Sequence, residues 1–310
     1  MFAQYGEVER RRMYEIKLPR QLNKNSIRDV IISFRNYVDS CVTGSEITID
    51  MRGITFIEPA GVIALSNIIQ WARKNKNVHV NFIIDTSSKD SRNINAMEYL
   101  SDCSFFANFN QADIFKVPRL RQTTLELKEV GTTKINQWKQ SDLMTWLQSR
   151  TGRRNEFSSI CVAIDEIFNN ISDHSQEHIG SIFGQHYPNL DRIIIAVSDF
   201  GIGIPASIKR KFELDRPDNE LIEHALKEGI SSQSVPQNRG AGLSNIMKTL
   251  TRNNIGEVTI ISNCGKVVII DNNVVESTSF EESYPGTFFE LIIDVSNEHL
   301  YDIEEEEEFE

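Results

Sequence analysis

Short β-branched runs alternate with segments of helical apolar spacing along the first third of the chain, and this alternation most restricts the fold. Residues 46–51 and 78–84 predict strands, whereas residues 26–41 carry apolar side chains at helical intervals. Pro59 stands in the first turn of a helix predicted over residues 59–74, where a missing N–H costs little. Such alternation favours an α/β fold in which helices cover a sheet.

The length of 310 residues predicts about two domains, at roughly 100–200 residues each. A basic, polar break at residues 151–156 precedes a second apolar-rich region. We expect both domains to be α/β. The expected boundaries are a first domain over residues 12–112, a connecting segment over 113–139, a second domain over 140–296 and an acidic tail over 297–310.

The formal net charge of −11 is concentrated at the C-terminus, where the last nine residues hold seven acids and no bases. This tail is expected to be solvated. The basic cluster Arg10 to Arg12 is too short to indicate a nucleic-acid surface.

Four widely spaced cysteines predict reduced thiols rather than disulfides or a zinc site. No apolar run approaches the length of a membrane span, and the N-terminus has no signal-peptide pattern. These features predict a cytoplasmic protein that binds neither membrane nor nucleic acid.

A helix predicted over residues 157–174 carries a polar stripe beside its apolar one. Glu166 and Asn170 are one turn apart on the polar stripe. A carboxylate can orient a water, and an amide oxygen can complete a magnesium shell of phosphates and waters. A half-exposed helix whose polar flank meets solvent accounts for the stripe equally well. The apolar stripe comprises Ile160, Ile164, Ile167 and Ile171.

An acidic residue and two spaced glycines follow the predicted strand 192–198, in the sequence Asp199-Phe200-Gly201-Ile202-Gly203. Glycines at such a position let the backbone approach a ligand closely. Asp199 can accept a hydrogen bond from an exocyclic amine such as that of adenine. A tight turn capped by the Asp is the structural alternative.

A third motif, Asn238-Arg239-Gly240-Ala241-Gly242-Leu243, opens a helix predicted over residues 243–251. Free N–H groups at a helix start form a phosphate site beside the positive end of the dipole. The dinucleotide fingerprint and the Walker A sequence are both absent.

Taken in order, Glu-x-x-x-Asn, Asp-x-Gly-x-Gly and Gly-x-Gly-Leu resemble the motifs of the GHKL ATPase superfamily over residues 140–296. That family includes gyrase-type ATPases, heat-shock chaperones, MutL-type repair proteins, sensor histidine kinases and anti-sigma-factor kinases. The resemblance implies an α/β sandwich with a mixed sheet and helices on one face. It also implies ATP and Mg²⁺ as cofactors.

The same resemblance implies a role for each motif residue. Glu166 would be the general base, Asn170 would ligate Mg²⁺, and Asp199 would bind the adenine amine. Residues 209–239 would form a mobile lid, and the glycine motif would hold the phosphates. The implied cofactor-binding residues are Asn170, Asp199, Gly201, Gly203, Arg239, Gly240, Gly242, Leu243 and Thr287.

In the first domain, the strand 47–51 and the loop 56–61 resemble the STAS domains of anti-sigma-factor antagonists, over residues 12–112. In that family a phosphorylatable serine precedes the helix. Here Pro59 stands in its place, so this loop lacks the hydroxyl that phosphorylation needs. A generic α/β turn with Pro at the helix start is the alternative.

The pairing of the two resemblances predicts an ATP·Mg²⁺-binding signalling protein of the anti-sigma-factor-kinase type. It would act on a protein partner by phosphotransfer to Ser/Thr or by nucleotide-dependent sequestration. One alternative is a slow ATPase switch, driven by lid closure and homodimer formation. The other is a nucleotide-sensing docking module without catalysis.

Overall fold

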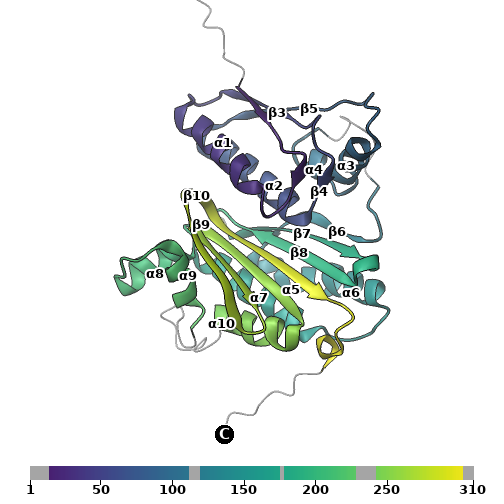
Figure 1. Cartoon of the computed structure of the whole chain (residues 1–310), viewed down its shortest axis with the longest axis vertical. Helices are drawn as coiled ribbons and strands as arrows, with labels where there is room; N and C mark the ends of the chain where they lie inside the picture. Colours follow the sequence, from purple (N-terminus) through teal and green to yellow (C-terminus); the bar gives the residue numbers. More distant parts are fainter. Residues whose placement is uncertain (1–13, 112–118, 175–177, 228–241, 303–310) are drawn as a thin grey trace, which may run out of the picture.

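The computed structural model describes residues 14–111, 119–174, 178–227 and 242–302. Its elements stack in layers, which Figure 1 shows from top to bottom: a small sheet, a helical layer, a larger sheet and a second helical layer. The mixture of helices and sheets confirms the predicted α/β class.

The N-terminal unit contains a three-stranded parallel sheet in the order β1-β3-β5. The segment 54–57 does not extend this sheet, because its β4 pairs with β2 instead. The strands are β1 (Tyr14–Lys17), β2 (Gln21–Leu22), β3 (Glu46–Asp50), β4 (Phe56–Ile57) and β5 (His79–Ile83), and the helices are α1 (Ile27–Ser40), α2 (Pro59–Lys76), α3 (Ser91–Asp102) and α4 (Phe105–Asn108).

The second unit is built on a five-stranded sheet in the order β6-β7-β8-β10-β9. The sheet expected to be mixed is antiparallel in each described pairing. Asp271 and Asn272, both at positive φ, join β9 to β10 in a two-residue turn, and such a turn can join only antiparallel strands. The strands are β6 (Thr124–Gly131), β7 (Ile179–Tyr187), β8 (Arg192–Ser198), β9 (Gly256–Ile270) and β10 (Asn273–Asp294).

The helices of this unit cover one face of the sheet and extend beyond its edge. α5 and α6 are joined by a π-helical turn at Lys139–Leu143, and a second π-helical turn at Met247–Thr251 continues α10. The helices are α5 (Ile135–Trp138), α6 (Met144–Thr151), α7 (Ser158–His174), α8 (Ile204–Phe212), α9 (Asp218–Ala225) and α10 (Leu243–Ile246).

Two features of this sheet differ from the sequence expectation. The segment 113–139 was expected to connect two domains, but its β6 pairs with β7 as an edge strand of the second sheet. Strand β7 itself was not expected, because glycines at 180 and 184 weaken the strand pattern. A Cβ at Gly180 would lie 2.7 Å from Cδ1 of Ile171, so α7 packs too closely there for a side chain.

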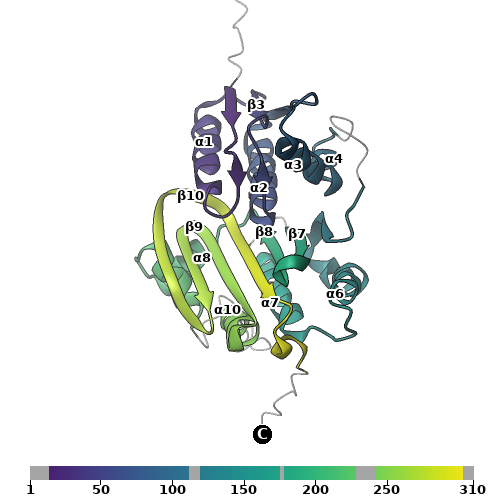
Figure 2. The ribbon, with the colours of Figure 1, turned by 45° about the vertical axis from the view of Figure 1, so that its right-hand side comes forward.

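Helix α2 lies between the two sheets and is buried over most of its surface. Figure 2 shows α1 and α2 side by side above the larger sheet. The apolar cluster that contains α2 also includes Phe183, Ala196, Ile261 and Phe288 of that sheet. The two units therefore share one apolar core across this interface.

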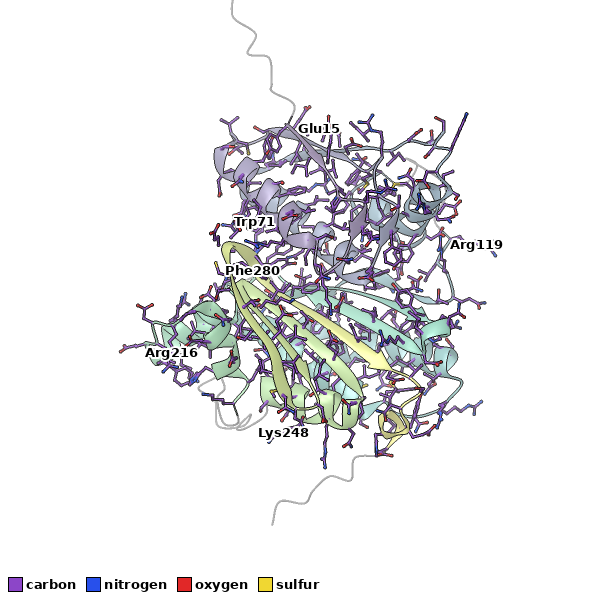
Figure 3. The ribbon with its side chains drawn as sticks, viewed as in Figure 1. Glu15, Trp71, Arg119, Arg216, Lys248 and Phe280 are labelled. Atoms are coloured by element: carbon purple, nitrogen blue, oxygen red, sulfur yellow. The ribbon has the colours of Figure 1, made fainter. Side chains whose placement is uncertain are left out.

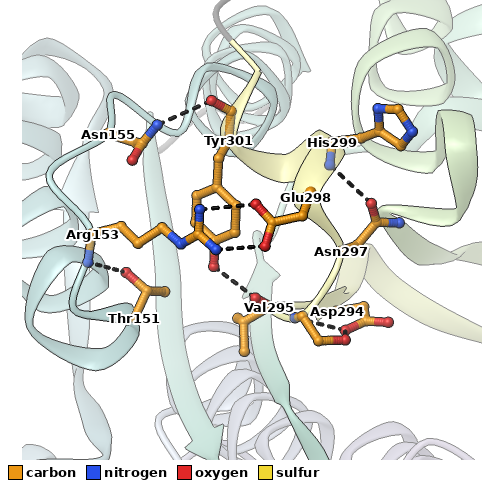
Figure 4. A network of polar contacts seen from close by, with 10 residues as sticks. Thr151, Arg153, Asn155, Asp294, Val295, Asn297, Glu298, His299 and Tyr301 are labelled. Carbon is orange, nitrogen blue, oxygen red and sulfur yellow. Dashed lines mark hydrogen bonds and ion pairs between the residues drawn. The ribbon is translucent and has the colours of Figure 1, made fainter.

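The C-terminal residues 297–302 were expected to belong to a solvated acidic tail, but they dock on the loop between α6 and α7 (Figure 4). The guanidinium of Arg153 pairs with Glu298 at 2.6 Å and lies 4.0 Å from the ring centroid of Tyr301. Leu300 is buried in the core of the second unit. The rest of the expected tail, residues 303–310, lies outside the described residues.

A glycine substitution in α2 tests how tightly this helix is packed. A Cβ at Gly61 would lie 2.3 Å from the carbonyl oxygen of Leu22. Alanine normally stabilises a helix interior relative to glycine. Gly61→Ala should nevertheless lower the free energy of unfolding by about 1–3 kcal/mol, because overpacking outweighs helix propensity. Chemical denaturation measures this change.

Gly53→Ala is the matched control, since a Cβ there would meet only the Leu18 carbonyl oxygen at 3.8 Å. Its effect should stay within about 1 kcal/mol. A Gly61→Ala protein as stable as the parent would contradict the close contact between α2 and β2.

Candidate functional site

Helix α7 positions the first two candidate residues as its periodicity predicts. Its four isoleucines at 160, 164, 167 and 171 are buried in the core of the second unit. Glu166 is only 6% exposed, so the carboxyl does not simply face solvent. Burial raises the pKa of Glu166, while a hydrogen bond from Asn245 opposes this shift.

Asn245 links this helix to the glycine motif. Its Nδ2 donates to Oε1 of Glu166 at 3.0 Å, and its backbone N–H donates to the carbonyl of Gly242 at 2.8 Å. The structure thus brings the start of α10 beside α7, although the two segments are far apart in the sequence. Sequence reasoning did not select Asn245; a polar residue three positions after the last glycine was the available signal.

Asn170 is half-buried one turn after Glu166. Its Nδ2 donates to the backbone carbonyl of Glu166 at 2.7 Å. The amide oxygen is therefore the acceptor that Asn170 can offer to a metal ion or its water. Leu243 packs into the apolar core, so only its backbone N–H could serve a ligand.

Asp199 follows β8, and its side chain continues the row of β8 side chains on the face of the sheet that α7 covers. Ile195 and Val197 of this strand pack into the core of the second unit, and Asp199 continues their alternation. Its carboxyl accepts a hydrogen bond from the N–H of Gly201. Burial raises the pKa of Asp199 to about 7, and the backbone N–H groups of Gly201 and Thr287 limit the shift.

Strand β10 holds the other side of Asp199. The N–H of Asp199 donates to the carbonyl of Thr287 at 3.0 Å. Gly286 has φ of 88°, and a Cβ there would lie 2.2 Å from the carbonyl oxygen of Asp199. Glycine is therefore required next to Asp199 for both conformational and steric reasons.

Ser262 of β9 completes this end of the site and was not found from the sequence. Its hydroxyl lies 2.9 Å from Oγ1 of Thr287 and accepts the N–H of Ile204 at 2.9 Å. Gly203, at φ of 86°, packs against Asn263, whose Oδ1 would lie 2.4 Å from an added Cβ. Ser262 therefore ties the glycine loop and Thr287 to one strand.

The predicted residues thus form two groups on the side of the sheet that α7 and α10 cover. The first group is Glu166 and Asn170 with Gly242 and Leu243. The second group is Asp199, Gly201 and Gly203 with Thr287. Arg239 and Gly240 lie outside the described residues, as do residues 228–239 of the expected lid. The described part of that lid, up to residue 227, contains the end of α8 and all of α9.

Magnesium would need few protein ligands at this site. In the described part of the chain, no three His, Cys, Asp or Glu side chains are grouped to hold a metal ion. Magnesium bound with a nucleotide takes most of its oxygen ligands from phosphates and waters. One amide oxygen, that of Asn170, is compatible with this pattern.

No protein-family model matches this chain, and no curated protein matches its sequence. The ATPase region of topoisomerase II from Saccharomyces cerevisiae is similar over 49% of this chain and 40% of that chain, with a TM-score of 0.28 and 13% identity. Within the described ranges, no helix is both long enough and apolar enough to cross a membrane.

The raised pKa of Asp199 predicts a pH-dependent cost in stability. The folded state binds this proton more tightly than the unfolded state, so stability falls as pH rises from 3.8 to about 7. Asp199→Asn keeps the shape and removes the buried charge. Its Tm should exceed that of the parent by several degrees at pH 8, with a smaller difference at pH 5, in thermal unfolding without nucleotide.

Asp50→Asn is a control with the opposite sign. Arg52 holds the pKa of Asp50 below its usual value, so Asp50 contributes stability at neutral pH that is lost as pH falls through that lowered pKa. Asp50→Asn should lower the Tm at pH 8. If Asp199→Asn also lowered it, burial would not dominate the Asp199 environment.

Proposed function

We propose that this chain binds ATP with Mg²⁺ on the side of the larger sheet that α7 and α10 cover. The hydrogen bond between Asn245 and Glu166 carries this proposal. It joins the polar stripe of α7 to the helical segment that follows the glycine motif. The pairing of Asp199 with Thr287 supports a second, base-binding end of the same site. Ordered motifs that meet in this way support a nucleotide site better than any one of them.

Each group has a distinct chemical role in the proposed site. Asp199 accepts a hydrogen bond from the adenine amine, and the Thr287–Ser262 hydroxyl pair supports this end. The N–H groups at the start of the helical segment 243–251 face the phosphates. Asn170 offers its oxygen to the magnesium shell.

Glu166 serves as the general base. Burial raises its pKa and so makes its carboxylate a better proton acceptor near neutral pH. The hydrogen bond from Asn245 holds one carboxyl oxygen, and the other can face the nucleophile. As the nucleophile's oxygen bonds to the terminal phosphorus, Glu166 takes the oxygen's proton, and the bond from phosphorus to the ADP leaving group breaks.

The nucleophile that we favour is a Ser or Thr hydroxyl of a protein partner, in the manner of anti-sigma-factor kinases. The sequence resemblances to that kinase type and to STAS domains support this assignment. Pro59 replaces the serine in this chain's own loop, so the acceptor is another protein. A slow ATPase switch, in which water is the nucleophile, is the second candidate. In such a switch the contact of α2 with the backbone of Asp199 would link the nucleotide site to the N-terminal unit.

Turnover of Mg·ATP tests the role of Glu166. Glu166→Gln replaces the general base with a side chain of nearly the same shape, so turnover should fall by about 100-fold or more. ATP affinity should change little, because Glu166 does not contact the adenine ring in the proposed site. Glu129→Gln, the same exchange at an exposed position on edge strand β6, should leave turnover and affinity unchanged. Undetectable ATP binding by the parent would refute the proposed function, and undiminished turnover in Glu166→Gln would refute the base assignment.

Terminally labelled ATP distinguishes the acceptors. Incubation of the chain with candidate partner proteins should give acid-stable label on a partner, and this label should disappear with Glu166→Gln. Label released only as free phosphate would instead support the ATPase switch. Saturable binding with neither product would leave a nucleotide-sensing module.

A further inference from the structure

The N-terminal unit reaches the base-binding end of the site through one buried side chain of α2. Asn67 is fully buried, and its Nδ2 donates to the backbone carbonyl of Asp199 at 3.2 Å. The same nitrogen lies 3.1 Å from the hydroxyl of Tyr284 and 3.3 Å from the carbonyl of Pro285. An amide nitrogen has two hydrogens, so these three acceptors share them.

Asn67 completes the fixation of the Asp199 backbone. The N–H of Asp199 is held by Thr287 of β10, and its C=O is held by Asn67 of α2. The hydroxyl of Ser198 lies 2.8 Å from that of Tyr284 and donates to the carbonyl of Thr287 at 2.9 Å. These contacts fix both polar backbone groups of Asp199, and the N–H of Gly201 holds its carboxyl, so together they set the direction of that carboxyl.

Helix α1 holds the chain segment that leads to Thr287. A guanidinium nitrogen of Arg35 donates to the carbonyl of Ser283 at 3.2 Å, and Arg28 lies 5.3 Å from the ring centroid of Phe280. Helices α1 and α2 both contact β10, and Figure 3 labels Trp71 of α2 and Phe280 of β10 on the two sides of this boundary. Strand β10, which holds the Asp199 N–H through Thr287, is therefore anchored to the N-terminal unit.

We propose that Asn67 is a positioning residue for nucleotide recognition, through which the N-terminal unit controls selectivity for adenine. This inference rests on the proposed function, because it assumes that Asp199 binds the adenine amine. A shift of α2 changes the angle of the Asp199 carboxyl and so the affinity for ATP. By linkage, bound ATP stabilises the observed packing of α2 on the sheet.

Asn93 provides a matched control for the loss of a buried amide. It is 2% exposed, and its Nδ2 donates to the carbonyls of Met51 and Ile54 inside the N-terminal unit. Like Asn67, it has an Oδ1 without a hydrogen-bond partner in the described structure. Asn93→Ala therefore reproduces the structural cost of Asn67→Ala at a position that does not touch Asp199.

The test compares affinities of the full chain for ATP and for purine riboside triphosphate, which lacks only the 6-amino group, with Mg²⁺ at pH 8. The parent should prefer ATP by about tenfold or more, the value of one hydrogen bond to a charged group. Asn67→Ala should bind ATP about tenfold more weakly and the analogue nearly as well as the parent does. Asn93→Ala should keep the parent's preference.

Thermal unfolding establishes that each variant is folded before binding is measured. If Asn67→Ala does not fold, Asn67→Leu takes its place, with Asn93→Leu as its matched control: it keeps a side chain of similar size, removes the donor to the Asp199 carbonyl and should also reduce the preference for ATP. A folded Asn67→Ala, or in its place Asn67→Leu, with the parent's preference would overturn the inference while leaving the proposed function intact. A parent that binds neither nucleotide would instead overturn the proposed function.

Discussion

The burial of α2 between two sheets is the constraint on which the rest of the structure depends. Apolar side chains lie on nearly every side of this helix, and a helix of that kind is stable only when it is covered on every side. One side contacts α1 and β2 of the N-terminal unit, and the other contacts β7, β8 and β10. Without α2, Phe183 and Phe288 would be exposed on the larger sheet. The apolar face of that sheet therefore depends on the N-terminal unit.

The candidate site lies on the opposite face of the same sheet, which α7 and α10 cover. Side chains alternate along β8: Val197 and then Asp199 lie on the face that α7 covers, whereas Ala196 lies on the face that α2 covers. The carbonyl of Asp199 nevertheless accepts a hydrogen bond from Asn67. Asp199 follows the last residue of β8, so its carbonyl lies beyond the strand. An acid on one side of the sheet is thus held by an amide from the other.

The two buried acids of the site illustrate how local partners set the chemistry of a carboxyl group. Burial raises the pKa of both Glu166 and Asp199. Each keeps hydrogen-bond donors, Asn245 for Glu166 and the Gly201 N–H for Asp199, and these donors favour the ionised form. Asp50, paired with Arg52 near the surface, has its pKa lowered instead. A carboxylate whose pKa is raised toward neutral pH, such as that of Glu166, suits proton transfer. A carboxylate with few competing hydrogen-bond donors, such as that of Asp199, suits recognition of an amine.

Local sequence patterns determined the helix α7, the strand β8 and the glycine loop after Asp199, because periodicity and glycine placement act over a few residues. They did not identify β7, since Gly180 is required by contact with α7 rather than by strand propensity. The partners Asn245, Ser262 and Asn67 were decided by tertiary structure alone. Each bonds to a group far away in the chain, and a hydrogen-bonding side chain carries no local mark of its distant partner. The sequence thus determined the local motifs that we propose for a nucleotide site, and the packing of α2, α7 and α10 on one sheet decided which of their residues meet.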